Sequence, residues 1–273
     1  MQQQNTIVKL QNILQQKQQA FQNVLPEGIK AEKLIQTAVY VAGRDPKVLT
    51  CTIPSILRAV FNAAMLGLIP GSSIGGAYIV PYYNGKIKQY EAVMIPDYRG
   101  LLKIARRAGV QGIEAHVVWK DDEFSYEYGT NAYIRHVPRD NNDIDYDTDD
   151  KLKAAWVGWY ESGLYRFAVM SRAQILKRKY MALDKVRPEH RSETPWMLWT
   201  EEMILKTVIK YAAKMMPLSE ELATAITLDN QHEAGLPQQA IIPQSQQIVD
   251  FDIEDKSIRD INEEKEVKNE QTK

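Results

Sequence analysis

The clearest chemical signal in the sequence is a row of cations on one short segment, residues 98–108. Pro96 ends the strand-like run before it, and Gly109 stands where a helix C-terminal glycine would. At about 100° per residue, the basic side chains share roughly a third of the helical wheel and apolar ones take the other side. With no carboxylate at i±4, these cations repel one another. They indicate either a solvated face or an anionic ligand, most commonly phosphate; they are Arg99, Lys103, Arg106 and Arg107.

A second cationic row lies on a helix predicted over residues 195–216, between Thr194 and Pro217. Lysines at i, i+4 and i+8 share an arc of the wheel with two tryptophans: Lys206, Lys210, Lys214, Trp196 and Trp199. Cations that follow phosphates, beside flat side chains that accept base faces, are what sequence-independent single-strand binding requires. The alternative is that both tryptophans pack in a core or against a neighbouring subunit.

A third basic segment follows Ser171, which forms a predicted capping box with Gln174. The helix predicted after this box carries Lys177 and Arg178. We add both to the candidate nucleic-acid ligands.

Several kinds of catalytic and metal chemistry lack their sequence signatures. No P-loop pattern is present, and no Ser-His-Asp or Cys-His arrangement stands out. The four histidines have no metal-ligand spacing. Residues 140–150 are rich in aspartate but lack the glycine and terminal glutamate of a calcium loop. We therefore expect no enzyme, cofactor or metal site, and interpret residues 140–150 as a mobile acidic loop.

Composition indicates a soluble cytoplasmic protein with a charge asymmetry. Of 273 residues, 44% are hydrophobic, which is enough for a substantial core. The net charge of −1 combines −6 from residue 229 onward with +5 before it. The single cysteine, Cys51, fits a reducing compartment and a buried site. The uncharged stretch 59–85 is interrupted by glycines and prolines, so it does not predict a membrane span.

The hydrophobic pattern predicts an α+β fold. Helices are expected over residues 3–24, 31–42 and 53–67, followed by a hairpin across Asn84-Gly85. Further strands are expected at 113–119 and 123–128, and a second hairpin over 152–170. This predicts an antiparallel sheet of hairpins around the central basic helix, then C-terminal helices and a disordered acidic tail.

The same pattern suggests three parts of the chain. Residues 1–28 carry a sparse apolar stripe that suits helix–helix association, residues 29–228 form the body, and residues 229–273 the flexible tail. We predict that the stripe mediates self-association through Leu10, Leu14 and Phe21. The alternative is that this helix packs on its own body.

A set of short motifs runs in order through about residues 20–228. They include Leu66-Gly67-Leu68-Ile69-Pro70-Gly71-Ser72, Gly76-Ala77-Tyr78, Tyr98-Arg99-Gly100, Ala105-Arg106-Arg107, Asp122-Glu123-Phe124, Pro195-Trp196, Glu201-Glu202-Met203, Lys206-Thr207 and Pro217-Leu218-Ser219. As a set they resemble phage recombinases of the RecT type. The sequence departs from that family's pattern at Asp97, where a glycine is usual.

The resemblance implies an ATP-independent protein that anneals single-stranded DNA. Such proteins coat single strands as rings or helical filaments and pair them with a complement through an annealed duplex intermediate. They are encoded by phages or prophages, act in the bacterial cytoplasm, and work with a 5′-to-3′ exonuclease. A host single-strand binding protein is a further candidate partner.

A basic groove could promote pairing by screening the repulsion between two DNA strands and releasing counterions. If it holds phosphates and leaves base edges outward, base pairing itself tests homology. Two other functions remain open. An RNA-binding or replication accessory protein would use the same basic faces, and a metal-dependent nuclease would use the aspartates of residues 140–150.

Overall fold

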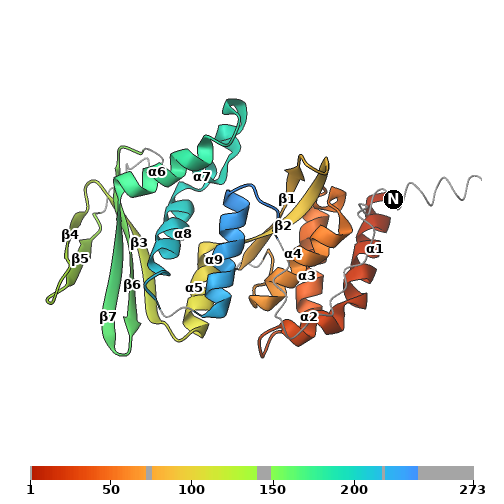
Figure 1. Ribbon diagram of the computed structural model, residues 1–273, viewed down its shortest axis with the longest axis horizontal. Helices are drawn as coiled ribbons and strands as arrows, with labels where there is room; N and C mark the ends of the chain where they lie inside the picture. Colours follow the sequence, from red (N-terminus) through yellow and green to blue (C-terminus); the bar gives the residue numbers. More distant parts are fainter. Residues whose placement is uncertain (1, 72–75, 140–148, 217–218, 239–273) are drawn as a thin grey trace, which may run out of the picture. The chain divides into compact units, whose positions relative to one another are not determined.

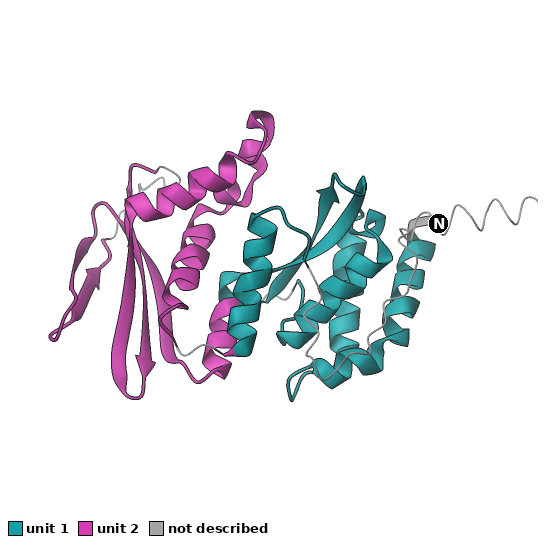
Figure 2. Ribbon diagram, in the orientation of Figure 1, with its two compact units in different colours: residues 1–100, 220–273 teal, residues 101–219 magenta. Residues whose placement is uncertain are grey.

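The computed structural model describes residues 2–71, 76–139, 149–216 and 219–238, which form two compact units (Figure 1; Figure 2). Unit 1 comprises residues 1–100 and residues from 220 onward, and unit 2 comprises residues 101–219. The fold is α+β, as predicted, with N-terminal helices, antiparallel strands and C-terminal helices. This division replaces the predicted separation of residues 1–28 from the body, because the first two helices belong to unit 1.

In unit 1 the N-terminal helices pack around one buried helix. They are α1 (Gln2–Gln16), α2 (Gln18–Val24), α3 (Ala31–Arg44) and α4 (Ile53–Met65), with a 3-10 turn η1 (Val48–Thr50) before α4. α4 begins with Pro54 in its first turn and buries most of its side chains. α1 contacts α2 and α3, and α2 and α3 contact α4.

The predicted self-association stripe is part of this core. Leu10 is 1% exposed, and Leu14 and Phe21 are fully buried. The stripe packs against α3 of the same chain, which has an apolar face of its own with Leu34 and Ile35 buried. A narrow stripe is sufficient here since it only completes a helical layer. The prediction that these three residues form a subunit contact is therefore wrong.

The other part of unit 1 is a hairpin of β1 (Ala77–Asn84) and β2 (Gln89–Pro96), with the register Tyr83 opposite Tyr90. The turn is longer than predicted and covers residues 85–88. The outer edge of β2 is occupied by polar groups from elsewhere in the unit. The Thr52 amide donates to the Tyr90 carbonyl at 2.9 Å, and the Ala92 amide donates to Ser55 Oγ at 2.8 Å.

The same edge holds residues that were predicted to lie in a disordered tail. α9 (Glu220–Glu233) contacts β2, Asp229 is fully buried, and Gln238 is 4% exposed. The side-chain oxygen Oε1 of Gln238 accepts a hydrogen bond from the backbone amide of Met94 at 2.9 Å. The Gln238 side-chain nitrogen Nε2 donates one to the backbone carbonyl of Met94 at 2.7 Å. The body therefore extends to residue 238. The rest of the predicted tail, residues 239–273, lies outside the described residues.

Unit 2 contains the remaining strands. β3 (Gln111–Trp119), β6 (Leu152–Glu161) and β7 (Leu164–Ser171) form an antiparallel sheet in the order β3-β6-β7. β4 (Glu123–Glu127) and β5 (Tyr133–Val137) form a separate hairpin. The described strands thus make three small sheets, and the single sheet predicted around the basic helix is not formed.

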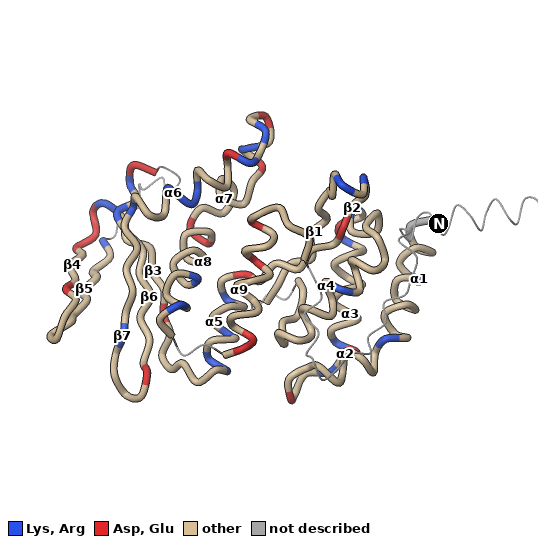
Figure 3. The backbone as a smooth tube through the Cα atoms, in the orientation of Figure 1, with Lys and Arg blue, Asp and Glu red and all other residues tan. Residues whose placement is uncertain are grey.

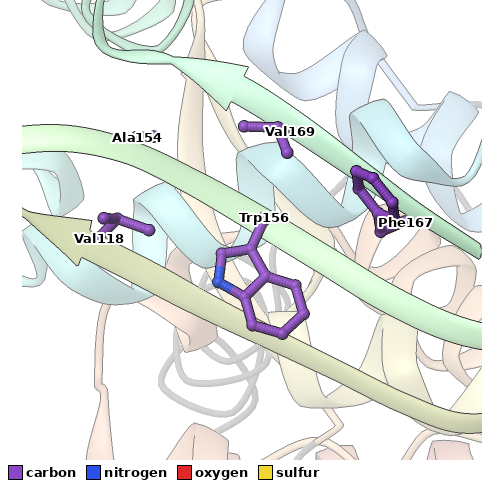
Figure 4. Packing of buried hydrophobic residues seen from close by; sticks show 5 residues of the cluster. All are labelled: Val118, Ala154, Trp156, Phe167 and Val169. Atoms are coloured by element: carbon purple, nitrogen blue, oxygen red, sulfur yellow. The ribbon is translucent and has the colours of Figure 1, made fainter. Parts of the chain in front are cut away.

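Both faces of the three-stranded sheet are covered, which explains why β6 is buried along most of its length. Val118, Ala154, Trp156, Phe167 and Val169 form a cluster on one face (Figure 4). Phe124 of β4 and Ile134 of β5 pack against this cluster. On the other side, the sheet contacts α8 (Thr200–Ala212) through all three strands.

A buried polar chain fixes the β4–β5 hairpin in unit 2. Trp156 Nε1 donates to His136 Nδ1 at 3.1 Å, and His136 Nε2 lies 3.0 Å from Asp122 Oδ2. Asp122 also accepts the amides of Trp119 and Arg139. Burial acts to raise the pKa of Asp122, but these hydrogen bonds outweigh it and lower the pKa below 3.8. The carboxylate therefore stays ionised and joins the hairpin to the sheet.

The remaining helices of the unit include the one predicted over residues 195–216, which is not continuous. α6 (Arg172–Leu183) follows β7, then the 3-10 helix η2 (Pro188–Glu193) and α7 (Pro195–Leu198) lead to α8. The predicted helix 195–216 is thus divided, because Trp199 has φ −137° and ψ 61° and ends α7. α5 (Tyr98–Arg107) contains the last residues of unit 1 and the first of unit 2.

Candidate nucleic-acid interface

The N-terminus of α5 is fixed by the side chain of Asp97. Asp97 Oδ1 accepts the Gly100 amide, and Oδ2 accepts the Gly76 amide at 3.1 Å. A side chain is excluded at Gly100, because a Cβ there would lie 2.1 Å from the Gly76 carbonyl oxygen. The aspartate therefore caps the helix and also ties its start to the chain that precedes β1.

α5 has the amphipathic character that its sequence predicts. Leu101, Ile104 and Ala105 are buried on one side. Among its cations, Lys103 is half-buried and the three arginines are exposed: Arg99, Arg106 and Arg107. Arg99 lies over the Tyr98 ring, 5.4 Å from its centroid, and belongs to unit 1. The other three cations of α5 belong to unit 2, and Figure 3 shows basic positions along this helix.

The second cationic row is largely internal. Lys206 is only 6% exposed, Lys210 is half-buried, and Lys214 is exposed beyond the end of α8 at Ala212. The two tryptophans also differ: Trp196 is 6% exposed and Trp199 is 57% exposed. The helical-wheel projection of residues 195–216 is valid only for a continuous helix. The backbone at Trp199 is not helical, so α7 and α8 do not share one axis. Trp196 therefore has no ring face open to a ligand in this structure, whereas the Trp199 side chain is exposed.

The third basic segment forms as predicted. Ser171 and Gln174 make the reciprocal capping box, and Lys177 and Arg178 are exposed on α6. α6 contacts α8, and both helices belong to unit 2. The sequence pattern also placed α5 and the Lys206 row in a single groove, and that placement remains a prediction.

One cation of α6, Lys179, is buried in an ion pair, unlike its exposed neighbours. Lys179 is 4% exposed and donates to Asp149 Oδ1 at 2.7 Å, while Tyr180 Oη donates to Asp149 Oδ2 at 2.7 Å. Burial acts to raise the pKa of Asp149, but the hydrogen bonds from Lys179 and Tyr180 more than offset it and lower the pKa. The neighbouring cations Lys177 and Arg178 remain at the surface.

Two features of unit 1 and unit 2 were not singled out from the sequence. One is the buried hydrogen-bond chain of Asp122, His136 and Trp156; Asp122 occurs in one of the quoted motifs, but the spacing of the three residues is not recognisable in the sequence. The other is the end of the β1–β2 hairpin, where exposed tyrosines stand beside Lys86 and Lys88. The second had a visible signal, since three tyrosines and two lysines occur within residues 82–90 without a carboxylate.

The described residues show no site for metal chemistry. They contain no group of three or more His, Cys, Asp or Glu side chains arranged to hold a metal ion. Most of the acidic loop, residues 140–148, lies outside the part of the chain that the structure describes. Cys51 is fully buried as predicted, and burial, with lesser effects of Asp45 and Glu91, raises the pKa of its thiol to about 12. In the described segments, no helix is both long and apolar enough to cross a bilayer.

The fold and the exposed residues define an α+β protein with cationic helical surfaces and no described metal centre. The model of the RecT family matches residues 32–246. The chain is also 32% identical to Protein RecT of Escherichia coli (strain K12) over 208 residues, which cover 75% of this chain and 73% of that protein. The protein belongs to the RecT family, as the resemblance of its motifs indicated.

Proposed function

We propose that the protein binds single-stranded DNA and anneals complementary strands without ATP, in homologous recombination in a bacterial cytoplasm. Membership of the RecT family supports this proposal, together with the exposed cations of α5 and α6. These cations are the single structural observation that carries it, because they lie outside the core on helices whose apolar sides are buried.

The proposed DNA ligands follow the exposure of the side chains. Exposed arginines and lysines bind phosphates, and Trp199 accepts a base face; the phosphate ligands are Arg99, Arg106, Arg107, Lys177, Arg178 and Lys214. Lys103 and Lys210, which are half-buried, can reach a phosphate through their flexible stems. Lys206 and Trp196 leave the set because they are buried.

Annealing follows from this chemistry without catalysis of a covalent step. Cations that neutralise phosphates release counterions and reduce the repulsion between two strands. Because contacts to phosphates carry no sequence information, the base pairs themselves select the complement. No nucleotide hydrolysis is needed, since the free energy of base pairing drives the reaction.

Assembly into rings or filaments is part of the proposal. One copy covers a limited run of nucleotides, so long homology requires several copies bound side by side. The contact between copies does not use Leu10, Leu14 or Phe21, which are core residues. A 5′-to-3′ exonuclease that exposes the single strand, and a host single-strand binding protein, are the proposed partners.

Two complementary dye-labelled DNA oligonucleotides, mixed with the protein in the absence of nucleotide triphosphate, test the proposal. We expect faster annealing than without protein, and a large part of this acceleration should disappear in the variant Lys177→Gln/Arg178→Gln. The matched control is Lys30→Gln/Lys33→Gln, which removes two exposed cations near the start of α3. Unaccelerated annealing, or tighter binding to RNA than to DNA of equal length, would contradict the proposed function.

A further inference from the structure

The end of the β1–β2 hairpin combines exposed aromatic side chains with cations. We call residues 82–90 the hairpin tip. Three tyrosines and an isoleucine are 38–50% exposed there: Tyr82, Tyr83, Tyr90 and Ile87. Lys86 and Lys88 are exposed in the turn between the strands, and Figure 3 shows basic positions at this end of the β1–β2 hairpin. The tip contains no carboxylate, so its formal charge is +2.

The nearest carboxylate in the sequence is already neutralised. Glu91 Oε1 accepts a hydrogen bond from Arg58 at 2.9 Å, and its Oε2 accepts one from Asn84 Nδ2 at 2.7 Å. The same Asn84 side chain accepts the Lys86 amide at 3.0 Å, which shapes the turn. The two lysines therefore face an anion without competition from Glu91.

The tyrosines stand on a rigid base. The Thr52 amide bonds the Tyr90 carbonyl, and Ser55 and Gln238 hold the outer edge of β2 farther along. The Tyr83 and Tyr90 rings contact each other with centroids 5.3 Å apart and planes at 66°. Because the strand edge is held and the two rings support each other, a ligand that uses them orders little additional chain.

The backbone of the turn gives an independent indication. Lys88 has φ 55°, one of two residues other than glycine with positive φ among the described residues. Glycine or asparagine would adopt this conformation at lower cost. A lysine that persists in a strained, exposed position is better explained by its cation than by the fold.

We propose that the hairpin tip is a second nucleic-acid contact, in which Tyr83 and Tyr90 stack on unpaired bases while Lys86 and Lys88 bind the adjoining phosphates. This inference rests on the proposed function and assigns a binding site to the β1–β2 hairpin of unit 1, in addition to the cations already proposed as phosphate ligands. Tyrosine rings accept any base face, and lysines bind phosphates without sequence preference. The charge of the tip favours a polyanion over a second protein surface. Since stacking needs free base faces, the tip distinguishes single strands from a finished duplex.

The variant Tyr83→Leu/Tyr90→Leu tests the stacking interaction. We expect its affinity for an oligo(dT) strand to fall about fivefold or more for each base that no longer stacks, with unchanged affinity for preformed duplex. Tyr83→Phe/Tyr90→Phe retains both rings and should bind as the wild type does. Tyr40→Leu is the matched control, because Tyr40 is 59% exposed on α3 of the same unit.

Two further measurements separate binding from folding. The variant Lys86→Gln/Lys88→Asn leaves the tyrosines in place and suits the positive φ at residue 88. It should reduce the salt slope for single strands by about 0.7 for each phosphate that the variant no longer neutralises. In the wild-type protein, oligonucleotides containing 5-iodouracil should cross-link on irradiation to peptides that include residues 82–90.

Unchanged affinity of the leucine variant for oligo(dT), with no cross-link to residues 82–90, would overturn this inference while leaving the annealing function intact. A leucine variant that sediments differently without DNA, but binds oligo(dT) normally, would show a contact between copies and also overturn it. Failure of the wild-type protein to bind or anneal single strands would instead overturn the proposed function.

Discussion

The basic rows of α5 and of residues 195–216 have similar patterns on a helical wheel but different fates in the fold. α5 is a single helix with one buried side, so its arginines are exposed. The second row is interrupted at Trp199, and α8 packs on all three strands of the sheet in unit 2. Lys206 and Trp196 are consequently buried. A helical wheel predicts a surface only where the helix is continuous and one of its sides stays uncovered.

The largest expected effect comes from separating the two tryptophans of that second row. Trp196→Ala should lower the free energy of unfolding by about 3–5 kcal/mol, because it removes a buried indole. Trp199→Ala should change it by no more than about 0.5 kcal/mol. The affinity for a single-stranded oligonucleotide should fall about fivefold in the Trp199 variant, because one base then has no ring to stack on. Urea unfolding measures the free energy of unfolding, and fluorescence anisotropy measures the affinity for the oligonucleotide. Equal destabilisation by both substitutions would refute the assignment of Trp196 to the core and of Trp199 to the surface.

The next effect concerns the buried and exposed cations of α6. Asp149→Asn should lower the free energy of unfolding at neutral pH by about 1.5–3 kcal/mol. The reason is that the group that accepts the hydrogen bonds from Lys179 and Tyr180 loses its negative charge. The folded-state pKa of Asp149 lies below its ordinary 3.8. Its contribution is therefore complete above about pH 3.8 and is lost as the pH falls through the folded-state value.

The difference between wild type and Asp149→Asn should accordingly disappear in acid. Asp150→Asn is the control, because its side chain is 94% exposed and pairs only at the surface with Arg172. Thermal unfolding across the pH range 2–7 provides the comparison. If the difference grew as the pH fell, the sign assigned to the Asp149 interaction would be wrong.

A smaller effect is expected at the start of α5. Asp97→Ala should lower the free energy of unfolding by about 1 kcal/mol, since the Gly100 and Gly76 amides lose their acceptor. Asp97→Asn keeps an oxygen at the same position and should restore most of that stability. Denaturant titration of the three proteins gives the result, and a stable alanine variant would mean that α5 does not depend on this cap.

Much of the local structure could be predicted because it depends on nearby residues. The capping box of Ser171 and Gln174 formed as expected, and the β6–β7 turn uses Ser162 and Gly163 with φ of 51° and 79°. The helical character of α5 also followed from its own side chains. These features need no knowledge of distant parts of the chain.

The remaining features depend on tertiary contacts. β5 is short and carries Arg135 and His136, and it becomes a strand because His136 meets Trp156 and Asp122. The sequence around Gln238 is polar and predicts a tail, but the side-chain amide of Gln238 bonds the backbone of Met94 at the edge of β2. The break at Trp199 did leave a signal, because Glu201 and Glu202 lie in the first turn of a new helix, where acidic residues are favoured.

Whether the exposed cations of α5 bind the phosphates of single-stranded DNA is decided most directly by the salt dependence of binding. We predict that Arg106→Gln/Arg107→Gln reduces the slope of log K against log salt by about 1.4, because two phosphates are no longer neutralised. Lys30→Gln/Lys33→Gln, which removes the same charge from the exposed start of α3, should leave the slope unchanged. Equal slopes for the wild type and the α5 variant would show that these arginines are only a solvated face.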